Sequence, residues 1–290
     1  MEFALRSALL CFVCAAIYIL KFYLFRGVNY CSSLNGEKTR EWTSVAVAEG
    51  VCVADVNLEK GEETVKQFQQ KFGKETVFFI KADVTNEKEF EDAFKEAVTR
   101  LGNIDIMVNN AGIMDESKWE LMIQINVTSL VRGTNMAIAH MNKVTGGKGG
   151  LVINTASVAG FAPGVSFPVY GGTKHAVIGF TTSWAANPNV ESMGIRFACL
   201  CPSPADTALL DLKDHQGIMV SRFTKFINEV LGVAPVSKIV EGFITLVEKD
   251  DNNGALLLVG KNEGIQFVNR FYDPMASLSK QKQDDTAKTS

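Results

Sequence analysis

The sequence predicts an α/β fold in which a doubly wound, Rossmann-type parallel sheet carries helices on both faces. From Val51 onward, short apolar runs alternate with stretches whose apolar residues recur every three or four positions, as in strands that alternate with amphipathic helices. The apolar runs are nearly continuous, which is typical of strands buried on both faces. With 290 residues, the chain can hold one large domain of this kind or two small ones.

Six apolar runs are the candidate strands. They are "VCVAD" (51–55), "TVFFI" (76–80), "IDIMVNNAG" (104–112), "GLVINTAS" (150–157), "GIRFACLCPS" (194–203) and "GALLLVG" (254–260). Polar residues follow most of these runs: Asp55, Asp83, the "NNAG" motif, Ser157 and the segment up to Thr207. Because the carboxyl ends of parallel strands meet at one edge of a sheet, we expect these residues to converge there and to form a ligand site.

The stretches between the runs have helical periodicity. After the first run, Val65, Phe68 and Phe72 follow one another at spacings of three and four. Residues 86–102 show a similar pattern and end at Gly102, a residue type that commonly closes helices. Strands and helices therefore alternate through most of the chain, which predicts a parallel sheet covered on both sides.

Composition and charge exclude several functional classes. The net charge of -3 and the apolar fraction of 47% indicate a globular protein without the basic surface that nucleic acids require. The six cysteines do not suggest a disulfide framework, and the three histidines are scattered, so no metal-ligand spacing is present. We expect a reducing compartment, no metal and no nucleic-acid partner.

The amino end is apolar and is a candidate membrane anchor. Residues 8–20 are uninterrupted apolar residues, and residues 3–25 would cross a bilayer if Arg6 and Lys21 extend to the headgroups. More positive charge follows this segment than precedes it, which predicts a catalytic body on the cytoplasmic side. A signal peptide and a segment folded into the domain are the alternatives. The predicted divisions are residues 1–26 for this segment, 27–270 for the Rossmann-type domain and 271–290 for a disordered tail.

Tyr170 and Lys174, in "PVYGGTKHAVIGF", are the first candidate catalytic pair. Four residues apart on a helix that starts just after Pro168, they share one face. A phenol ordinarily loses its proton near pH 10, and a neighbouring ammonium group favours the phenolate. Lowering the pKa of Tyr170 by roughly three units would make it a general base near neutral pH. Alone, a pair at this spacing is more often surface decoration.

Other motifs stand in a fixed order around this pair. The "NNAG" motif is followed by Asn126 in "IQINVTS", by Ser157 and, after the pair, by a Pro-x-x-x-x-Thr segment that ends at Thr207. Together these residues resemble the short-chain dehydrogenase/reductase family. The resemblance covers roughly residues 51–260 and implies a nicotinamide cofactor.

The resemblance also implies a role for each matching residue. Tyr170 would be the catalytic acid/base, Lys174 would lower its pKa and bind the nicotinamide ribose, Ser157 would position the substrate oxygen, and Asn126 would anchor a water in the proton relay. For the cofactor, Asp55 and Val56 would meet the adenine ribose, Asp83 and Val84 the adenine, Asn110 the neighbouring ribose and Thr207 the carboxamide. No arginine follows Asp55, whose carboxylate would repel a 2′-phosphate, so NAD is expected over NADP.

Within the family, "GGKGGLVINTASVAG" and "PVYGGTKHAVIGFT" resemble members that oxidise secondary alcohols of lipids to ketones. The implied substrate is a hydroxyprostaglandin or a similar hydroxy fatty acid. Phe167 is a departure, because those members have a glutamine three residues before the catalytic tyrosine. A hydrogen bond to the alcohol would be lost, and the substrate site would be more apolar. The family habit further implies a homodimer.

The glycine loop of this family, TGxxxGxG, is missing from its expected place. Counting back from Asp55 leads to "YCSSLNGEK" (30–38), where Gly36 is the only glycine and Glu37 would repel a phosphate. The first strand must then come from a segment such as "YLFRGVNY" (23–30). Three explanations remain open: a mis-joined or alternatively spliced amino end, weak NAD binding through the remaining contacts, and a non-catalytic, membrane-tethered lipid-binding relative.

Overall fold

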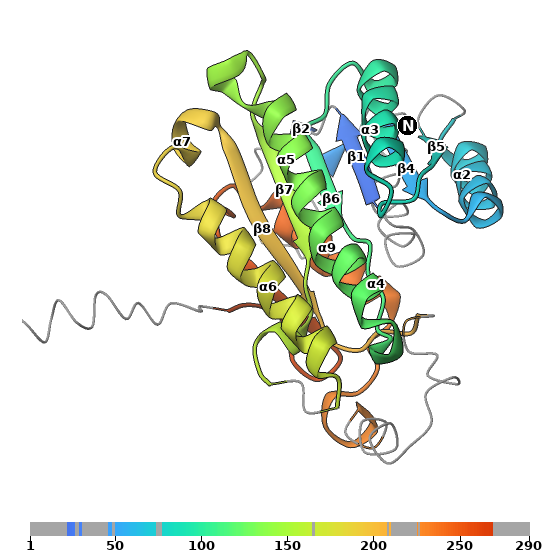
Figure 1. The fold of residues 1–290 in the computed structure, drawn as a ribbon, viewed down its shortest axis with the longest axis vertical. Coiled ribbons are helices and arrows are strands. Elements are labelled where there is room, and N and C mark those ends of the chain that lie inside the picture. Colours follow the sequence, from blue (N-terminus) through green and yellow to red (C-terminus); the bar gives the residue numbers. More distant parts are fainter. Residues whose placement is uncertain are drawn as a thin grey trace, which may run out of the picture.

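The computed structural model describes residues 22–26, 29–30, 46–47, 50–73, 77–163, 166–207, 209, 225 and 227–268. These residues form an eight-stranded sheet in the order β10-β9-β8-β7-β6-β1-β4-β5, with helices on both faces (Figure 1). The strands are β1 (Phe22–Arg26), β4 (Gly50–Asp55), β5 (Val77–Lys81), β6 (Ile106–Asn109), β7 (Gly150–Thr155), β8 (Ile195–Pro202), β9 (Leu256–Gly260) and β10 (Gly264–Phe267). All six candidate strands are confirmed, and so is the α/β class with its mainly parallel sheet.

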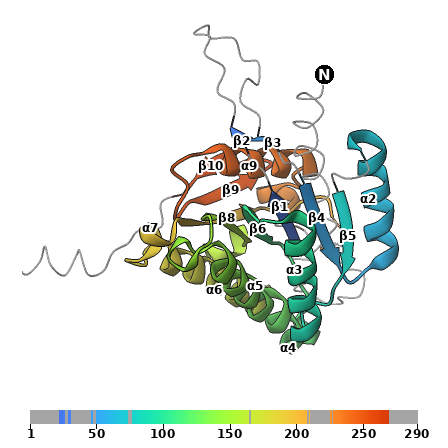
Figure 2. The ribbon, with the colours of Figure 1, turned by 90° about the horizontal axis from the view of Figure 1, so that it is seen from above.

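Helices cover the sheet from two sides, as Figure 2 shows. One face carries α2 (Leu58–Phe72) and α9 (Val236–Glu248), and the other carries α3 (Glu87–Leu101), α5 (Ser129–Met141) and α6 (Pro168–Ala185). The short helices α4 (Trp119–Ile123) and α7 (Val190–Met193) precede α5 and β8. This two-sided cover is the reason that the strands read as nearly continuous apolar runs.

The strand β4 illustrates how both faces are filled. Val51 and Val53 pack into the cluster under α2 and α9, whereas Cys52 and Ala54 pack into the cluster under α3 and α5. All four side chains are fully buried. Successive side chains of a strand point to opposite faces, so a strand between two helical layers has no exposed side and needs apolar residues at every position.

The strand β1 lies mid-sheet, between β4 and β6, but runs antiparallel to both neighbours. Phe22 pairs with Ala54 and Asn109, at the carboxyl edge of the parallel strands, whereas Arg26 pairs with Gly50 at the opposite edge. The segment predicted to supply the missing first strand therefore does so, in reversed direction. A separate pair, β2 (Asn29–Tyr30) with β3 (Ala46–Val47), lies between β1 and β4 in the chain.

The position of β1 corrects part of the expected membrane anchor. Residues 22–25 belonged to the candidate span at 3–25, and they form a sheet strand instead of a helix. Among the residues that the structure describes, no helix is long and apolar enough to cross a bilayer. Residues 1–21 and the predicted tail at 271–290 lie outside the described residues, so their roles stay predictions.

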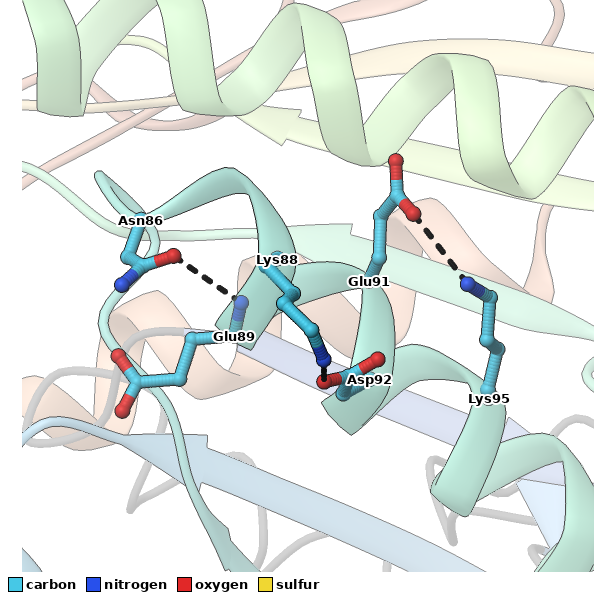
Figure 3. Close-up of polar contacts among 6 residues, drawn as sticks. All are labelled: Asn86, Lys88, Glu89, Glu91, Asp92 and Lys95. Atoms are coloured by element: carbon cyan, nitrogen blue, oxygen red, sulfur yellow. Dashed lines mark hydrogen bonds and ion pairs between the residues drawn. The ribbon is translucent and has the colours of Figure 1, made fainter.

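The helix α3 shows how the sequence sets an amphipathic helix. Asn86 caps its start by accepting a hydrogen bond from the backbone N–H of Glu89 (Figure 3). The exposed face carries lysine–carboxylate pairs one turn apart, Lys88 with Asp92 and Lys95 with Glu91. Such exposed pairs contribute little to stability, because water and salt screen them. The buried face, which includes Phe90 and Phe94, is what attaches α3 to the sheet.

The end of α5 contains a histidine that acts as a neutral hydrogen-bond acceptor. The Nε2 atom of His140 accepts a hydrogen bond of 3.3 Å from the backbone N–H of Ile104, and its ring meets Phe94 edge-on. Burial lowers the pKa of His140, and the nearby Asp105 carboxylate opposes this shift. Because the pKa is lower in the folded state than in the unfolded state, His140 stabilises the fold above the unfolded pKa, and this contribution is lost as the pH falls below it.

We predict that His140→Gln reduces the acid sensitivity of the fold. Glutamine offers an oxygen that can accept the Ile104 N–H bond at any pH, whereas protonated histidine cannot accept it. The midpoint of thermal unfolding of the wild type should therefore fall, relative to His140→Gln, as the pH drops below about 6.5. Calorimetric scans between pH 5 and pH 8 measure this difference. Parallel curves for the two proteins would contradict the assignment.

Candidate active site

The predicted catalytic residues converge at the carboxyl edge of the sheet. Ser157 follows β7, Tyr170 and Lys174 lie on the first turns of α6, and Asn126 lies in a π-helical turn, Gln124–Thr128, between α4 and α5. All four side chains are buried. The Lys174 Nζ atom lies 5.6 Å from the centre of the Tyr170 ring, and the Ser157 hydroxyl lies close enough to the Tyr170 phenol to lower its pKa. The structure thus brings three separate segments of the chain together.

Lys174 is held by the sheet. Its ammonium group donates a hydrogen bond of 3.0 Å to the carbonyl oxygen of Thr155, the last residue of β7. Burial lowers the pKa of Lys174 to about 8, because a charged amine is disfavoured in an apolar surrounding. Near neutral pH the group is therefore a cation that gives up its proton readily.

Tyr170 lies in a dry surrounding, and its expected acidification by Lys174 stays a prediction. Burial raises the pKa of Tyr170, and the hydrogen bond from Ser157 only partly opposes this shift. Both side chains are buried, and burial disfavours the charged form of each group.

Asn126 is fully engaged by the protein. Its amide oxygen accepts a hydrogen bond of 2.9 Å from the Ile113 N–H, and its amide nitrogen donates to the Ile113 carbonyl at 3.0 Å and to the Thr173 hydroxyl at 3.1 Å. Asn126 therefore ties the segment after β6 to α6. The water-anchoring role implied by the family resemblance stays a prediction.

The residues expected to bind the cofactor occupy the same edge. Asp55 ends β4, is 4% exposed, and accepts a hydrogen bond of 2.7 Å from the Asn57 N–H, while Val56 beside it is exposed. Asp83 accepts hydrogen bonds from Thr85, the Val84 side chain is buried in the core, and the Val84 carbonyl accepts a bond from Arg132. The position of Asp55 at the end of β4 suits a carboxylate that binds ribose hydroxyls.

Asn110 and Thr207 lie nearer the catalytic residues. Asn110 directly follows β6, two residues before Gly112, and a Cβ atom added at Gly112 would stand 3.5 Å from both the Asn126 amide oxygen and the Lys174 Nζ atom. Thr207 lies after β8, where its hydroxyl is 3.4 Å from the Ala205 carbonyl. The groups present therefore fit the two nucleoside ends of a dinucleotide.

The strand in the place of the family's first strand runs in the opposite direction. Because β1 is antiparallel, the chain leaves it at Arg26, at the edge of the sheet opposite to Asp55. The counted segment 30–38 starts in β2, and its remainder lies outside the described residues. Within the described residues, no glycine-rich turn follows β1 at the catalytic edge.

An apolar cluster lies against the catalytic phenol. It consists of Met114, Met122, Phe167 and Tyr170, with Ile113, Ala159 and Val169 packed against it. Phe167 belongs to the same cluster as Tyr170, and its contact with a substrate stays a prediction. The two methionines were not found from the sequence, because they lie on a loop and a short helix without a clear apolar period.

Glu116 is the other site residue that the sequence did not reveal. Its two carboxylate oxygens accept hydrogen bonds from the backbone N–H groups of Val169, at 3.2 Å, and Tyr170, at 2.9 Å. Its partners lie more than 50 residues further along the chain. A contact of this kind has no local sequence signal.

Comparisons with known proteins agree with this geometry. The family model described as short chain dehydrogenase matches residues 40–216. The chain is 35% identical to 15-hydroxyprostaglandin dehydrogenase [NAD(+)] of Rattus norvegicus over 236 residues, which cover 79% of this chain and 88% of the relative. The corresponding protein of Homo sapiens is 35% identical over 222 residues, which cover 75% of this chain and 84% of that protein.

Solved structures show the same fold. A short chain dehydrogenase/reductase from Burkholderia phymatum in complex with NAD superimposes with a TM-score of 0.60, at 18% identity, and covers 71% of this chain and 78% of its own. Levodione reductase gives a TM-score of 0.62 at 22% identity, with 73% and 86% of the two chains covered. ElxO with NADP bound gives 0.57 at 25% identity, with 72% and 86% covered.

Proposed function

The chain belongs to the short-chain dehydrogenase family, and we propose that it is an NAD-dependent dehydrogenase that oxidises a secondary alcohol of a lipid-like substrate to a ketone. The observation that carries the proposal is the convergence of Ser157, Tyr170 and Lys174 at the sheet edge that also holds Asp55. The curated relatives named 15-hydroxyprostaglandin dehydrogenase support the same reaction class.

The reaction assigns a separate task to each side chain. The substrate hydroxyl is held by Ser157 and gives its proton to the Tyr170 phenolate, while the hydrogen on the alcohol carbon leaves with its electron pair, so that a ketone forms. When bound, NAD+ would supply the acceptor for that hydride and a positive charge at the site. The Lys174 ammonium group, which is hydrogen-bonded to the Thr155 carbonyl, adds a second positive charge. Residues Asp55, Asn110, Lys174 and Thr207 would hold the cofactor.

The apolar surrounding of Tyr170 favours a lipid-like alcohol. Met114, Met122 and Phe167 pack together with the phenol, so a substrate that reaches it must leave water and contact hydrocarbon and thioether groups. Burial of this kind stabilises apolar chains by about 0.8 kcal/mol per CH₂ group. A hydroxy fatty acid or hydroxyprostaglandin carries a secondary alcohol within such a chain, and Phe167 supplies no hydrogen bond that would select between them.

The preference for NAD rests on Asp55. Asp55 is the last residue of β4, and its carboxylate stands where the 2′-phosphate of NADP would have to bind. Two negative charges placed so close together repel each other. The fold itself does not decide the matter, because ElxO is seen with NADP bound and the Burkholderia phymatum enzyme with NAD. The domain is predicted to lie in the cytoplasm, where NAD would be available to it.

A second copy of the chain is the partner that α6 suggests. Its outward face carries small exposed residues, which are Gly172, Ala176, Gly179 and Ser183. A Cβ atom added at Gly172 or at Gly179 would meet nothing within 4 Å. Small residues along one helix face let two helices approach closely, so this face supports the homodimer that the family habit implies.

We predict that the purified protein reduces NAD+ in the presence of a hydroxy fatty acid with a secondary alcohol. Tyr170→Phe and Lys174→Ala should each lower kcat/KM by about 10²–10⁴-fold, since each removes a group from the proton transfer. The nicotinamide absorbance measures the rate. His175→Gln, a change beside Lys174, serves as the control and should keep the wild-type rate. An active Tyr170→Phe enzyme, or a wild type that reduces no NAD+ with any hydroxy lipid, would refute the proposal.

Asp55→Asn should relax the choice of cofactor. Asparagine keeps the oxygen that accepts the Asn57 N–H bond but carries no charge, so the local structure is retained and the repulsion of a 2′-phosphate is removed. We expect the ratio of kcat/KM for NAD+ to that for NADP+ to fall by about tenfold or more. Glu59→Gln, a neutralised glutamate in the first turn of α2, is the matched control. An unchanged ratio in Asp55→Asn would show that another group selects the cofactor.

Gly179→Arg should separate the dimer. The added side chain projects into open space in the single chain but would collide with a second α6. Light scattering after gel filtration should give twice the chain mass for the wild type and the mass of one chain for the variant, with unchanged circular dichroism. A monomeric wild type would exclude this partner.

A further inference from the structure

We propose that Glu116 is a positioning residue that holds the first turn of α6, and with it Tyr170, in the orientation that proton transfer needs. This inference rests on the proposed dehydrogenase function. It adds a residue that the family resemblance did not point to, and it follows from contacts that cross between two elements of the described structure.

The helix α6 begins without a cap of its own. Phe167 occupies the N-cap position and makes no side-chain cap bond, and Pro168, which follows it, has no N–H group to satisfy. The next two backbone N–H groups, of Val169 and Tyr170, point to separate oxygens of the Glu116 carboxylate, Oε2 and Oε1. A side chain from another element thus does what serine or aspartate commonly does at a helix start. The negative charge also suits the positive end of the helix dipole.

A braced turn presents this carboxylate. Glu116 opens the short 3-10 helix Glu116–Lys118, whose N-cap Asp115 accepts hydrogen bonds from the Ser117 N–H, at 3.1 Å, and the Ser117 hydroxyl, at 2.6 Å. The Lys118 ammonium group forms an ion pair with the Asp115 carboxylate at 3.1 Å. The hydrogen bond from Ser117, and then that from Lys118, hold the pKa of Asp115 at about 2, so the brace stays charged at every pH at which the enzyme would work. Glu116 is therefore presented from a turn with little freedom.

The segment between β6 and α4 is tied to α6 at two points. Asn126 binds both backbone groups of Ile113 and reaches the Thr173 hydroxyl, and Glu116 binds the start of the helix. Tyr170 must meet Ser157, which belongs to the separate segment after β7. Rotation or fraying of the first turn of α6 would change the distance between these two hydroxyl groups, and the Glu116 bonds oppose that movement.

The placement of Glu116 predicts which kinetic constant depends on it. Its contacts end at the first turn of α6, whereas Asp55 ends β4 on the other side of β1 and β6. Loss of Glu116 should therefore lower kcat while the KM for NAD+ changes little. A shift of about 1 Å at reacting atoms can cost about a hundredfold in rate.

The test compares Glu116→Ala, Glu116→Gln and the control Glu120→Gln, which neutralises an exposed glutamate of α4. Hydrogen exchange of the backbone amides at residues 169 and 170 reports the cap directly and needs no turnover. We expect exchange to accelerate by about tenfold in Glu116→Ala. Glu116→Gln, which keeps one acceptor oxygen, should lie between Glu116→Ala and the wild type, and Glu120→Gln should match the wild type.

Kinetics complete the test at a temperature well below the unfolding midpoint of every variant. We expect kcat in Glu116→Ala to fall by about 10-fold to 100-fold, the KM for NAD+ to change by less than about 3-fold, and Glu116→Gln to recover part of the rate. Unchanged amide exchange, or an unchanged kcat per folded molecule, would overturn the proposal. Should Glu116→Ala fail to fold, Glu116→Gln alone decides by the same two measurements. A wild type without NAD+ reduction would instead refute the dehydrogenase function, and the exchange result would still stand.

Discussion

The arrangement of the site depends on one buried hydrogen bond, from the Lys174 ammonium group to the Thr155 carbonyl. An ammonium group away from water is costly unless it is paired, so this bond restrains α6 against the end of β7. Tyr170 stands one helical turn before Lys174, and Ser157 stands two residues after Thr155. The bond therefore sets the distance between the phenol and the serine hydroxyl as well as the place of the charge. The lowered pKa of Lys174, about 8, is the consequence of holding that charge in a dry site.

Because β1 is reversed, it supports the sheet without bringing its carboxyl end to the cofactor edge. Paired with both β4 and β6, the strand satisfies the backbone groups of its neighbours and keeps the sheet continuous. A parallel first strand would in addition deliver its following turn to the cofactor edge, and β1 cannot do so because its carboxyl end, Arg26, lies beside Gly50. The carboxylate of Asp55 and the groups around Lys174 remain at that edge.

Sequence reasoning predicted the parts of this molecule that have a local or periodic signal. The strands were found because burial on both faces removes polar residues from them, as at Val51–Ala54, and Tyr170 with Lys174 because four residues form one helical turn. The direction of β1 was not predictable, since an apolar strand reads alike in both directions. Glu116 was missed because its partners are distant in the chain. The burial of Tyr170 and Lys174 was not predictable either, because it is a property of the fold and has no local signal.

A buried network of polar side chains joins the strands and helices that lead to the catalytic edge. The Asn109 amide donates to the Asn154 amide oxygen at 2.8 Å and to the Thr134 hydroxyl at 3.1 Å, and the Asn154 amide donates to the Thr181 hydroxyl at 2.9 Å. These bonds join β6, β7, α5 and α6, the elements that lead to Asn110, Ser157 and Tyr170. Gly133 leaves room for them, because a Cβ atom there would come within 2.2 Å of the Asn109 amide oxygen. Low dielectric strengthens such bonds and makes each one costly to break. The network reaches α6 at Thr181, whereas the start of the helix is held separately, at Thr173 by Asn126, at Lys174 by the Thr155 carbonyl and at Tyr170 by Glu116.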